Sequence, residues 1–381
     1  MIWASIILII LLSCPWTMGF AQQNQAVAEL DGQLLINTSY SPDNELDFFA
    51  GARYLPEFSY EIPLDSTQLL DIEASANLST SSFFHPFDSI TADANIAPYR
   101  IWARYTGQQL EVRAGLQKID FGSASLLRSL QWFNQIDPRD PLQLTNGVYG
   151  LLGRYYFLNN ANIWLWGLYK NKQTRGFDVV PTHEALPEFG GRVQYPTPNG
   201  EIALSYHHRT ANSEDLVGVP AFKKIPENRF GLDGKWDLTI GLWFEVSYVH
   251  KSRNLGELTN QTLVTTGVDY TFGIGNGLSV MTEHLFGSFD AQKFTSGTRI
   301  NVSAFSLSYP LGLWDFLSAF GYFNWTMEDW AFFLNYEHQF KKITGYVMAF
   351  YNPTTQLGIQ QNSLVNNFAG PGLRLMVVYN H

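Results

Sequence analysis

The chain has a single cysteine, few charged residues and no long apolar run after its first residues. The lone Cys14 excludes an internal disulfide and a cysteine-ligated metal site. Charged residues make up 15% of the 381 residues, whereas soluble domains have roughly 25%. No later segment reaches the roughly 18 apolar residues that a membrane-spanning helix needs. The net charge of -10 argues against nucleic acid as a partner, because nucleic-acid sites are basic.

The first residues have the pattern of a secretory signal. Ile2–Leu12 is an apolar run that is too short to cross a bilayer as a helix. Small residues follow it up to Ala21, just before a polar stretch, and this predicts cleavage after Ala21. We therefore expect a signal peptide over 1–21 and the mature chain over 22–381.

Two features leave alternatives open at this end. No Lys or Arg precedes the apolar run, so an uncleaved anchor is the alternative to a cleaved signal. The stretch 11–14 loosely resembles a lipoprotein processing site, although Leu12 is larger than such sites prefer. The sequence does not decide whether Cys14 is lipidated.

From about Val27 onward, apolar and polar residues alternate with a period of two. The segments 110–117 (LEVRAGLQ) and 373–380 (LRLMVVYN) show this alternation. The period indicates β-strands, because successive side chains of a strand point to opposite faces. Segments of roughly ten residues with one apolar and one charged face are typical of transmembrane β-barrels. A soluble β-sandwich has shorter strands and an apolar inner face.

Short turn signals alternate with longer polar stretches along 22–381. Tight connections are expected near 63–65, 107–108, 159–160, 198–200, 238–239, 275–277, 313–315 and 341–342, where Gly- and Asn-rich pairs tolerate positive φ. Outer connections are expected near 39–45, 81–93, 118–146, 173–187, 210–226, 252–260, 289–299, 327–329 and 352–369. The count predicts an all-β, antiparallel up-and-down transmembrane barrel of about 18 strands, with 16 as the alternative. Both ends of such a barrel lie on the side of the short turns.

Aromatic residues gather at both ends of the expected strands, on the apolar face. Toward the short turns they are Tyr105, Tyr155, Phe157, Tyr195, Trp236, Tyr270, Phe272, Tyr309, Phe340 and Tyr379, and toward the outer loops they are Tyr169, Tyr206, Tyr248, Phe286, Phe323, Trp325 and Phe350. Two aromatic girdles fit the two interfaces of a bilayer. The strand around Phe333 is apolar on both faces, which makes its inner side locally apolar.

The opposite face of the strands carries charges of both signs. It includes Arg100, Arg104, Glu111, Arg113, Arg154, Glu188, Arg192, Glu201, Arg209, Asp233, Lys235, Glu245, Lys251, Asp269, Glu283 and Glu337. Such a lining fits a water-filled channel with a transverse field. The alternative is that the charges pair and close the lumen, although about 18 strands leave an interior too wide for side chains alone.

The insertion 118–146 is the longest, and it has an internal apolar pattern. Two possible cap residues precede apolar residues at helical spacing: Ser123, Ser125, Leu126, Leu127, Leu130 and Phe133. A rigid charged turn follows at Asp137–Asp140. We expect a loop with a short amphipathic helix that folds into the lumen and narrows it. The alternative is a helix packed on the rim of the barrel.

The segment from Leu110 to Phe157 resembles porin-like outer-membrane proteins of the broad alginate-export and carbohydrate-porin group. In that group a strand ends in an Arg-Gln-like pair, a loop carries an NP-D turn, and the next strand has Gly and Arg. This chain has Gln117-Lys118, Asp137-Pro138-Arg139-Asp140 and Gly153-Arg154 in those places, with Phe121-Gly122 where the group has Trp-Gly. The resemblance implies a passive channel of Gram-negative outer membranes with an inward third loop, but it does not identify the solute.

The candidate constriction residues lie near the base of this loop. They are Arg100, Trp102, Arg104, Arg113 and Arg154 on the barrel wall and Asp137, Arg139 and Asp140 on the loop. The wall arginines are expected to form a basic ladder opposite the loop acids, and such a crossed field orients dipolar solutes. The alternative is that the arginines pair with lumen acids and contribute only stability. Trp102, Trp166 and Trp243 add flat surfaces on which a sugar ring could slide.

Together these features predict an outer-membrane channel for passive diffusion of small polar solutes such as saccharides or organic ions. A channel for apolar compounds and a non-conducting barrel with partner-binding loops are the alternatives. No catalytic elbow, metal-ligand spacing or cofactor motif occurs in the sequence, so no enzyme is expected.

The expected partners are the lipid bilayer with its lipopolysaccharide, the barrel-assembly machinery and a small solute, and a homo-oligomer is an open alternative. The last strand resembles barrel-assembly signals, although it ends in His381 rather than in an aromatic residue. Both termini are expected in the periplasm. The sequence leaves the ion selectivity and the oligomeric state undetermined.

Overall fold

The computed structural model describes residues 26–87, 89–137, 140–295, 297–353 and 369–381. The expected signal peptide over 1–21, with Cys14, lies outside these ranges. Within them, no helix has the length and the apolar character that crossing a membrane requires.

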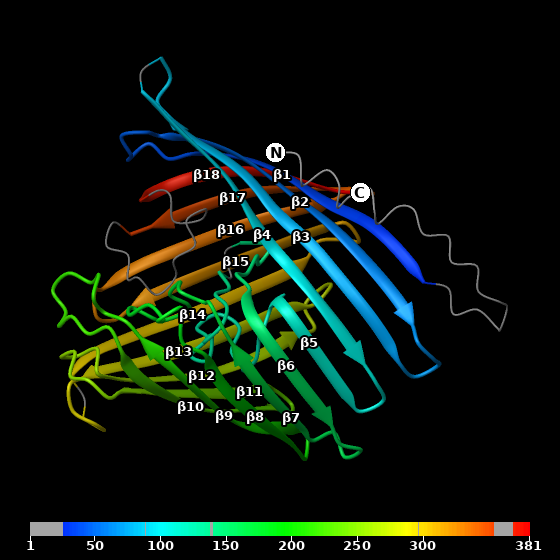
Figure 1. The fold of residues 1–381 in the computed structure, drawn as a ribbon. Coiled ribbons are helices and arrows are strands. Elements are labelled where there is room, and N and C mark those ends of the chain that lie inside the picture. Colours follow the sequence, from blue (N-terminus) through cyan, green and yellow to red (C-terminus); the bar gives the residue numbers. More distant parts are fainter. Residues whose placement is uncertain (1–25, 88, 138–139, 296, 354–368) are drawn as a thin grey trace, which may run out of the picture.

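The described residues form one closed sheet of 18 antiparallel strands (Figure 1). The strands are β1 (Val27–Tyr40), β2 (Phe48–Pro63), β3 (Leu69–Phe84), β4 (Ile90–Thr106), β5 (Leu110–Gln117), β6 (Val148–Tyr156), β7 (Asn162–Leu168), β8 (Glu188–Thr197), β9 (Gly200–Ala211), β10 (Ile225–Asp237), β11 (Gly241–Lys251), β12 (Asn260–Phe272), β13 (Leu278–Asp290), β14 (Thr298–Pro310), β15 (Asp315–Asn324), β16 (Asp329–Gln339), β17 (Ile343–Asn352) and β18 (Gly370–Asn380). Each strand pairs with its neighbours in the chain, and β1 also pairs with β18. The predicted up-and-down barrel of about 18 strands is confirmed, and the alternative of 16 is wrong.

The barrel closes between its first and last strands. Ile36 on β1 lies opposite Val377 on β18, and Gly32 and His381 exchange backbone hydrogen bonds of 3.2 and 3.0 Å. Because the number of strands is even, β1 begins and β18 ends on the side of the short turns. Closure pairs the two strands that would otherwise form the edges of the sheet.

The turn signals of the sequence mark the observed connections. The tight connections run from 64–68, between β2 and β3, to 340–342, between β16 and β17. One outer connection is shorter than expected, because β3 and β4 leave only 85–89 between them instead of 81–93. These two strands therefore extend as a long hairpin, with Phe84 directly opposite Ile90.

Side chains alternate between an exposed outer face and a largely buried inner face. On β18, Leu375 and Val377 are 53% and 48% exposed, whereas Met376 and Val378 are 4% and 1% exposed. One member of the predicted girdles is wrong: Phe350 on β17 points inward. It packs with inward phenylalanines of other strands, and both faces of β17 are apolar, so alternation could not assign its direction.

The wall of the barrel differs in height around its circumference (Figure 1). The four strands β1–β4 have 14, 16, 16 and 17 residues. The next four, β5–β8, have 8, 9, 7 and 10 residues. The two long insertions that enter the lumen both start in this low part of the wall, after β5 and after β7.

Candidate functional site

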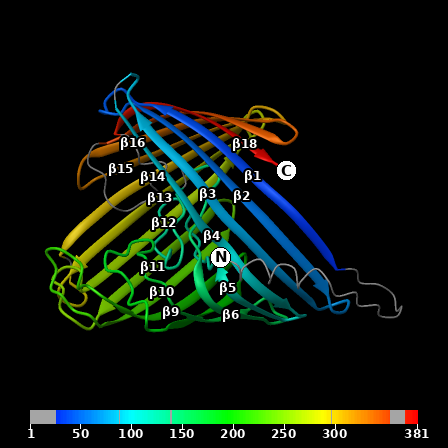
Figure 2. The same cartoon turned by 45° about the horizontal axis from the view of Figure 1, so that its top comes forward.

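The insertion between β5 and β6, residues 118–147, folds into the barrel (Figure 2). The backbone N–H groups of 125–127 donate to the carboxylate of Glu283 on β13 at 2.7, 3.0 and 2.6 Å. Two more N–H groups of the insertion donate to Glu245 on β11 at 2.8 and 3.0 Å. Both glutamates point inward and are buried. The predicted inward position of this loop is therefore confirmed.

The described part of this insertion contains no helix, so the predicted amphipathic helix is wrong. Its apolar residues pack in two different directions. Leu126 and Leu127 lie in a cluster with residues of β12–β14, while Leu130 and Phe133 pack with Leu152 and other residues of β6 and β7. Because carboxylates of the wall accept from the backbone of the insertion, its N–H groups are satisfied without a helical turn.

The insertion 169–187, between β7 and β8, also packs inside the barrel. Its Asp178 pairs with Arg209 on β9 at 3.1 Å and with Arg229 on β10 at 2.7 Å. Gly176 has a φ of 55°, and a Cβ added there would lie 2.1 Å from a carbonyl oxygen of the first insertion. Glycine is thus required where the two insertions touch.

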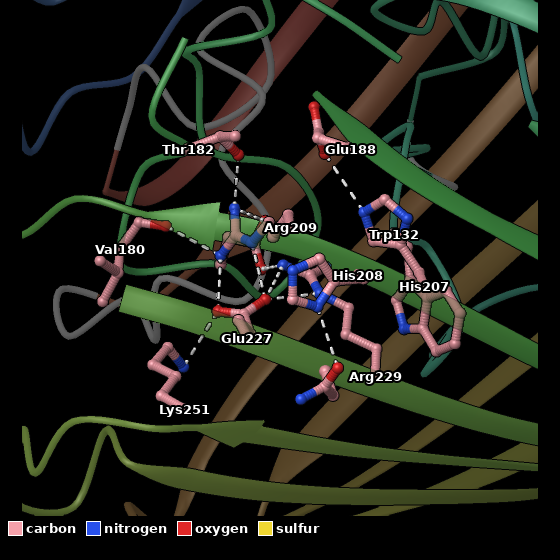
Figure 3. Close-up of polar contacts among 12 residues, drawn as sticks. Trp132, Val180, Thr182, Glu188, His207, His208, Arg209, Glu227, Arg229 and Lys251 are labelled. Atoms are coloured by element: carbon pink, nitrogen blue, oxygen red, sulfur yellow. Dashed lines mark hydrogen bonds and ion pairs between the residues drawn. The ribbon is translucent and has the colours of Figure 1, made fainter. Parts of the chain in front are cut away.

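A buried ionic network joins this second insertion to the wall, as Figure 3 shows. The carboxylate of Glu227 accepts from Arg209 at 2.6 and 3.0 Å and from Arg229 at 2.7 Å. Lys251 lies 3.5 Å from the same carboxylate. Arg209, Arg229 and Glu227 are at most 2% exposed, so the β9–β11 side of the lumen is filled by paired charges.

Two of the three proposed sugar-sliding surfaces lie beneath the first insertion. Trp166 is 3% exposed and stacks on Phe121 with ring centroids 5.8 Å apart. Trp243 is 5% exposed and donates its indole N–H to Glu283 at 3.0 Å. Neither ring can contact a solute, so this part of the prediction is wrong, because sequence alternation does not reveal what covers an inward residue.

A cavity of about 360 Å³ lies on the β1–β4 side of the lumen, between the first insertion and the wall. Amides, hydroxyls and charges of both signs dominate its lining, which includes Asn37, Arg53, Asn77, Asp93, Asn95, Tyr99, Gln135, Asp140, Thr145, Asn146 and Arg374. These residues come from β1–β4, from β18 and from the second half of the insertion. Polar groups of the wall and of the insertion thus line the same space, together with apolar residues such as Leu35, Met348 and Met376.

Three buried atoms of the lining have no hydrogen-bond partner among the described residues. They are Nε of Arg53, Oδ1 of Asn77 and Nε2 of Gln135. Buried polar atoms are normally hydrogen-bonded. Two donors and one acceptor are thus available at this cavity to water or to a polar solute.

Asp140 is the carboxylate that the insertion brings to this cavity. It is 8% exposed, and its Oδ1 accepts from the N–H of Leu142 at 3.0 Å. Burial raises the pKa of the Asp140 carboxyl, and repulsion from Asp137 adds to this effect, while the Leu142 N–H and the charge of Arg53 oppose it. The electrostatic partner of Asp140 on the wall is therefore Arg53 on β2.

The structure brings together three of the four arginines of the predicted ladder. Arg104 lies directly opposite Arg113 and binds both oxygens of Asp71, with contacts of 2.5 and 3.0 Å. Arg113 and Arg154 share Glu111 at 3.3 and 3.4 Å. Each of these three arginines thus has an acidic partner, as in the alternative of paired charges.

Trp102 and Arg100 complete this part of the wall. The guanidinium carbons of Arg104 and Arg113 lie 5.1 and 4.6 Å from the ring centroid of Trp102, which is cation–π distance. Arg100 donates to the carbonyl oxygen and to the hydroxyl of Thr145 at 2.9 and 2.8 Å. Arg100 therefore holds the end of the first insertion against β4.

That the loop acids Asp137 and Asp140 lie opposite the ladder stays a prediction. Asp137 and Asp140 are 1% and 8% exposed, and the charge of Arg53 on β2 acts on the Asp140 carboxylate. Arg139 lies outside the described residues. Within the described ranges, no three His, Cys, Asp or Glu side chains gather as a metal site.

Sequence reasoning missed Arg53 and Arg374 as cavity residues. Alternation alone puts Arg374 on the face of Met376, which is buried. Pro56 interrupts the alternation near Arg53, but β2 pairs with β1 through this proline, which lies opposite Gly32. Extending the alternation through the proline would have placed Arg53 inside.

Comparison with known proteins gives a likeness of fold. No protein-family model and no curated protein sequence matches the chain. Among solved structures, OmpF of Salmonella typhi, in complex with daunomycin, is similar with a TM-score of 0.50 and 9% identity over 93% of this chain and 97% of that chain. An anion-selective porin from Comamonas acidovorans has a TM-score of 0.49 and 12% identity over 94% and 100% of the two chains. The likeness to OmpF shows the barrel fold.

Proposed function

We propose that this protein is an outer-membrane channel for the passive diffusion of small polar solutes. The observation that carries the proposal is the polar cavity of about 360 Å³ between the first insertion and the β1–β4 wall. The insertion narrows the lumen without filling this side. A solute that crosses the barrel would pass along this wall.

The two faces of the strands support a place in a membrane. Exposed apolar side chains cover the outside, with Tyr155 and Tyr195 among the aromatic residues at one end and Tyr169 and Trp325 at the other. Aromatic girdles of this kind mark the two interfaces of a bilayer. The proposal includes a cleaved signal peptide and insertion by the barrel-assembly machinery. It also includes contact with the bilayer and its lipopolysaccharide.

The chemistry of the cavity favours small polar solutes. Its amides and hydroxyls suit a saccharide, and Arg53, Arg374 and Asp140 suit an organic ion. The resemblance of the 110–157 segment to porin-like outer-membrane proteins supports a passive channel but does not identify the solute. Trp102, next to the arginines of the ladder, is the remaining aromatic surface for a sugar ring.

Planar-bilayer recordings of the refolded chain test the proposal directly. We expect steps of single-channel conductance, and we expect deletion of residues 123–135 to raise the conductance while the barrel still assembles. A correctly folded protein without conductance would contradict the channel. Unchanged conductance in the folded deletion variant would mean that the insertion does not limit the passage.

An apolar solute is the second candidate, because phenylalanines point inward at one place. Phe49 and Phe350 are buried inside the barrel, with Phe83 and Phe333 packed against them. Liposome swelling separates the two candidates. Swelling in sugars or amino acids supports the polar pathway, whereas uptake restricted to apolar compounds would support a pathway along the phenylalanines.

A further inference from the structure

Two stretches of the chain repeat the same pattern of five residues. Residues 205–209 read SYHHR and residues 247–251 read SYVHK. They lie on β9 and β11, which flank β10. In each stretch the first, third and fifth residues are buried. The second and fourth residues, a tyrosine and a histidine, therefore point outward.

The first outward pair shares one acceptor on the neighbouring strand. The side-chain oxygen of Asn228 on β10 accepts from the hydroxyl of Tyr206 at 2.8 Å and from Nδ1 of His208 at 2.9 Å. An amide oxygen can only accept hydrogen bonds, so Nδ1 of His208 carries a proton. The other ring nitrogen, Nε2, is then turned away from the asparagine.

The second repeat, on β11, has the same arrangement with an asparagine of β12. The side-chain oxygen of Asn260 on β12 accepts from the hydroxyl of Tyr248 at 3.2 Å and from Nδ1 of His250 at 2.8 Å. The side chain of Asn260 is fixed in turn, because its amide nitrogen donates to the backbone at 3.0 Å. Both histidines are thus held in the same tautomer by an amide.

The two groups form a single row around the outside of the barrel. His208 lies opposite Asn228, Asn228 lies opposite His250, and His250 lies opposite Asn260. Neighbouring strands are roughly 4.8 Å apart, so the two imidazoles are about two strand spacings from one another. This span is wider than the oxygens of one phosphate can reach, so each imidazole meets an anionic group of its own, and the ring of His208 also packs on Phe189 of β8 with centroids 5.1 Å apart.

The surroundings of the row are those of a lipid–water interface. On one side lie the exposed apolar residues Leu204, Phe230 and Leu232, at 60%, 49% and 37% exposure. On the other side, Lys223 and Lys224 directly precede β10 and Arg253 follows β11, and all three are exposed. The same loops also carry the acids Glu214, Asp215 and Glu257, so the histidine row, and not the net charge of the loops, distinguishes this sector.

We propose that His208 and His250 of this row each bind a phosphate group of an anionic membrane lipid. Nε2 of each histidine contacts a phosphate oxygen, as a donor when the ring is protonated or as an acceptor from a protonated phosphate. The acyl chains lie over the apolar side chains on the other side of the row. This proposal concerns the outer surface and goes beyond the channel function.

A third outward group pairs a tyrosine and a histidine with a carboxylate instead of an amide. Tyr336 and His338 on β16 point outward at the end near the short turns, and both bind Oδ1 of Asp315, at 2.5 and 2.7 Å. Here the shared acceptor is a carboxylate, which repels a phosphate. The amide in the same role at the long-loop end therefore favours anionic headgroups at that end.

Native mass spectrometry of the full chain in detergent tests this site with two probes, phosphatidic acid and phosphatidylcholine. We expect retention of phosphatidic acid, and we expect roughly tenfold less of it in the double variant His208→Gln/His250→Gln, which corresponds to the loss of one good interaction. Asn228→Asp keeps the hydrogen bonds but adds a negative charge, so it should lower retention as well. His338→Gln is the matched control and should retain as much as the unchanged protein.

Three results would overturn the proposal. These are equal retention of phosphatidic acid by the folded double variant, equal retention of the two lipids by the unchanged protein, and an equal loss in the His338→Gln control. Inorganic phosphate that displaces the lipid at equal concentration would assign the row to a free anion instead of a lipid. Conductance should not change in any of these variants, so the result is independent of the proposed channel.

Discussion

The two sides of the lumen are built from the same kind of strand but are unlike in content. On the β6–β13 side, the two insertions cover the wall, and charges such as Arg209 and Glu227 are paired and buried. On the β1–β4 side, polar atoms such as Nε of Arg53 line a cavity and have no partner within the described ranges. Inward polar residues are thus paired and buried where a loop brings partners to them, and they line a cavity where no loop does.

The largest effect is expected where the paired side is broken. Replacing Glu227 by Ala leaves Arg209, Arg229 and Lys251 without their shared partner, so the free energy of unfolding should fall by about 3–5 kcal/mol. Glu57 on β2 points into the lumen but is exposed, and Glu57→Ala should change it by less than about 0.5 kcal/mol. Urea unfolding in detergent measures both. Similar losses in the two variants would show that the two sides are equally packed.

The next effect concerns the anchoring of the first insertion. Glu283→Ala removes the acceptor of three consecutive backbone N–H groups, and each buried unpaired donor costs about 1–3 kcal/mol. The insertion should then leave the wall, and the single-channel conductance should rise toward that of the 123–135 deletion. Glu337→Ala, an inward glutamate of β16, is the control and should conduct like the unchanged protein. Equal conductance of the two variants would contradict the anchoring role of Glu283.

A smaller effect is expected for the arginine ladder. The triple variant Arg100→Ser, Arg104→Ser and Arg113→Ser should shift the reversal potential in a salt gradient toward cation permeation, because fixed positive charge is removed from the lumen. Two of these arginines are paired with acids, which limits the shift. Because Arg100 also binds Thr145, the double variant of Arg104 and Arg113 serves as a control with an unaltered insertion. An unmoved reversal potential with intact conductance would place the ladder away from the constriction.

The smallest effect belongs to Asp140, the carboxylate at the cavity. Burial raises the pKa of Asp140, so its ionised form is disfavoured in the folded protein. As the pH falls from neutral toward the ordinary aspartate value of about 4, this carboxylate takes up its proton early and the cost of its buried charge is relieved. The cavity then becomes more positive beside Arg53, so selectivity should shift toward anions. In Asp140→Asn this shift should disappear, and its persistence would assign the titration to another group.

The fold could be predicted because its signals are local. The period of two in 110–117 and the turn pairs at 159–160 and 275–277 depend on neighbouring residues, and the observed connections lie at these positions. The register follows almost automatically, since each strand pairs with the next. The direction of the Phe350 side chain could not be predicted, because both faces of its strand are apolar.

The contents of the lumen could be predicted only in part, because they depend on contacts between distant segments. The spacing of Leu126, Leu130 and Phe133 matched a helix, but these side chains face different walls. The carboxylates that accept from the backbone N–H groups of Leu126 and Leu130 lie more than a hundred positions further along the chain. No local pattern contains that information, and the same is true of the meeting of Asp140 with Arg53.

The capping of the first insertion by Glu245 and Glu283 has a consequence for the order of assembly. Ala124 and Ser125 are separated from these glutamates by 121 and 158 positions, so β11 and β13 must be in place before the insertion can dock. The narrow passage therefore forms only once these two strands are present, and the two glutamates couple it to the building of the wall.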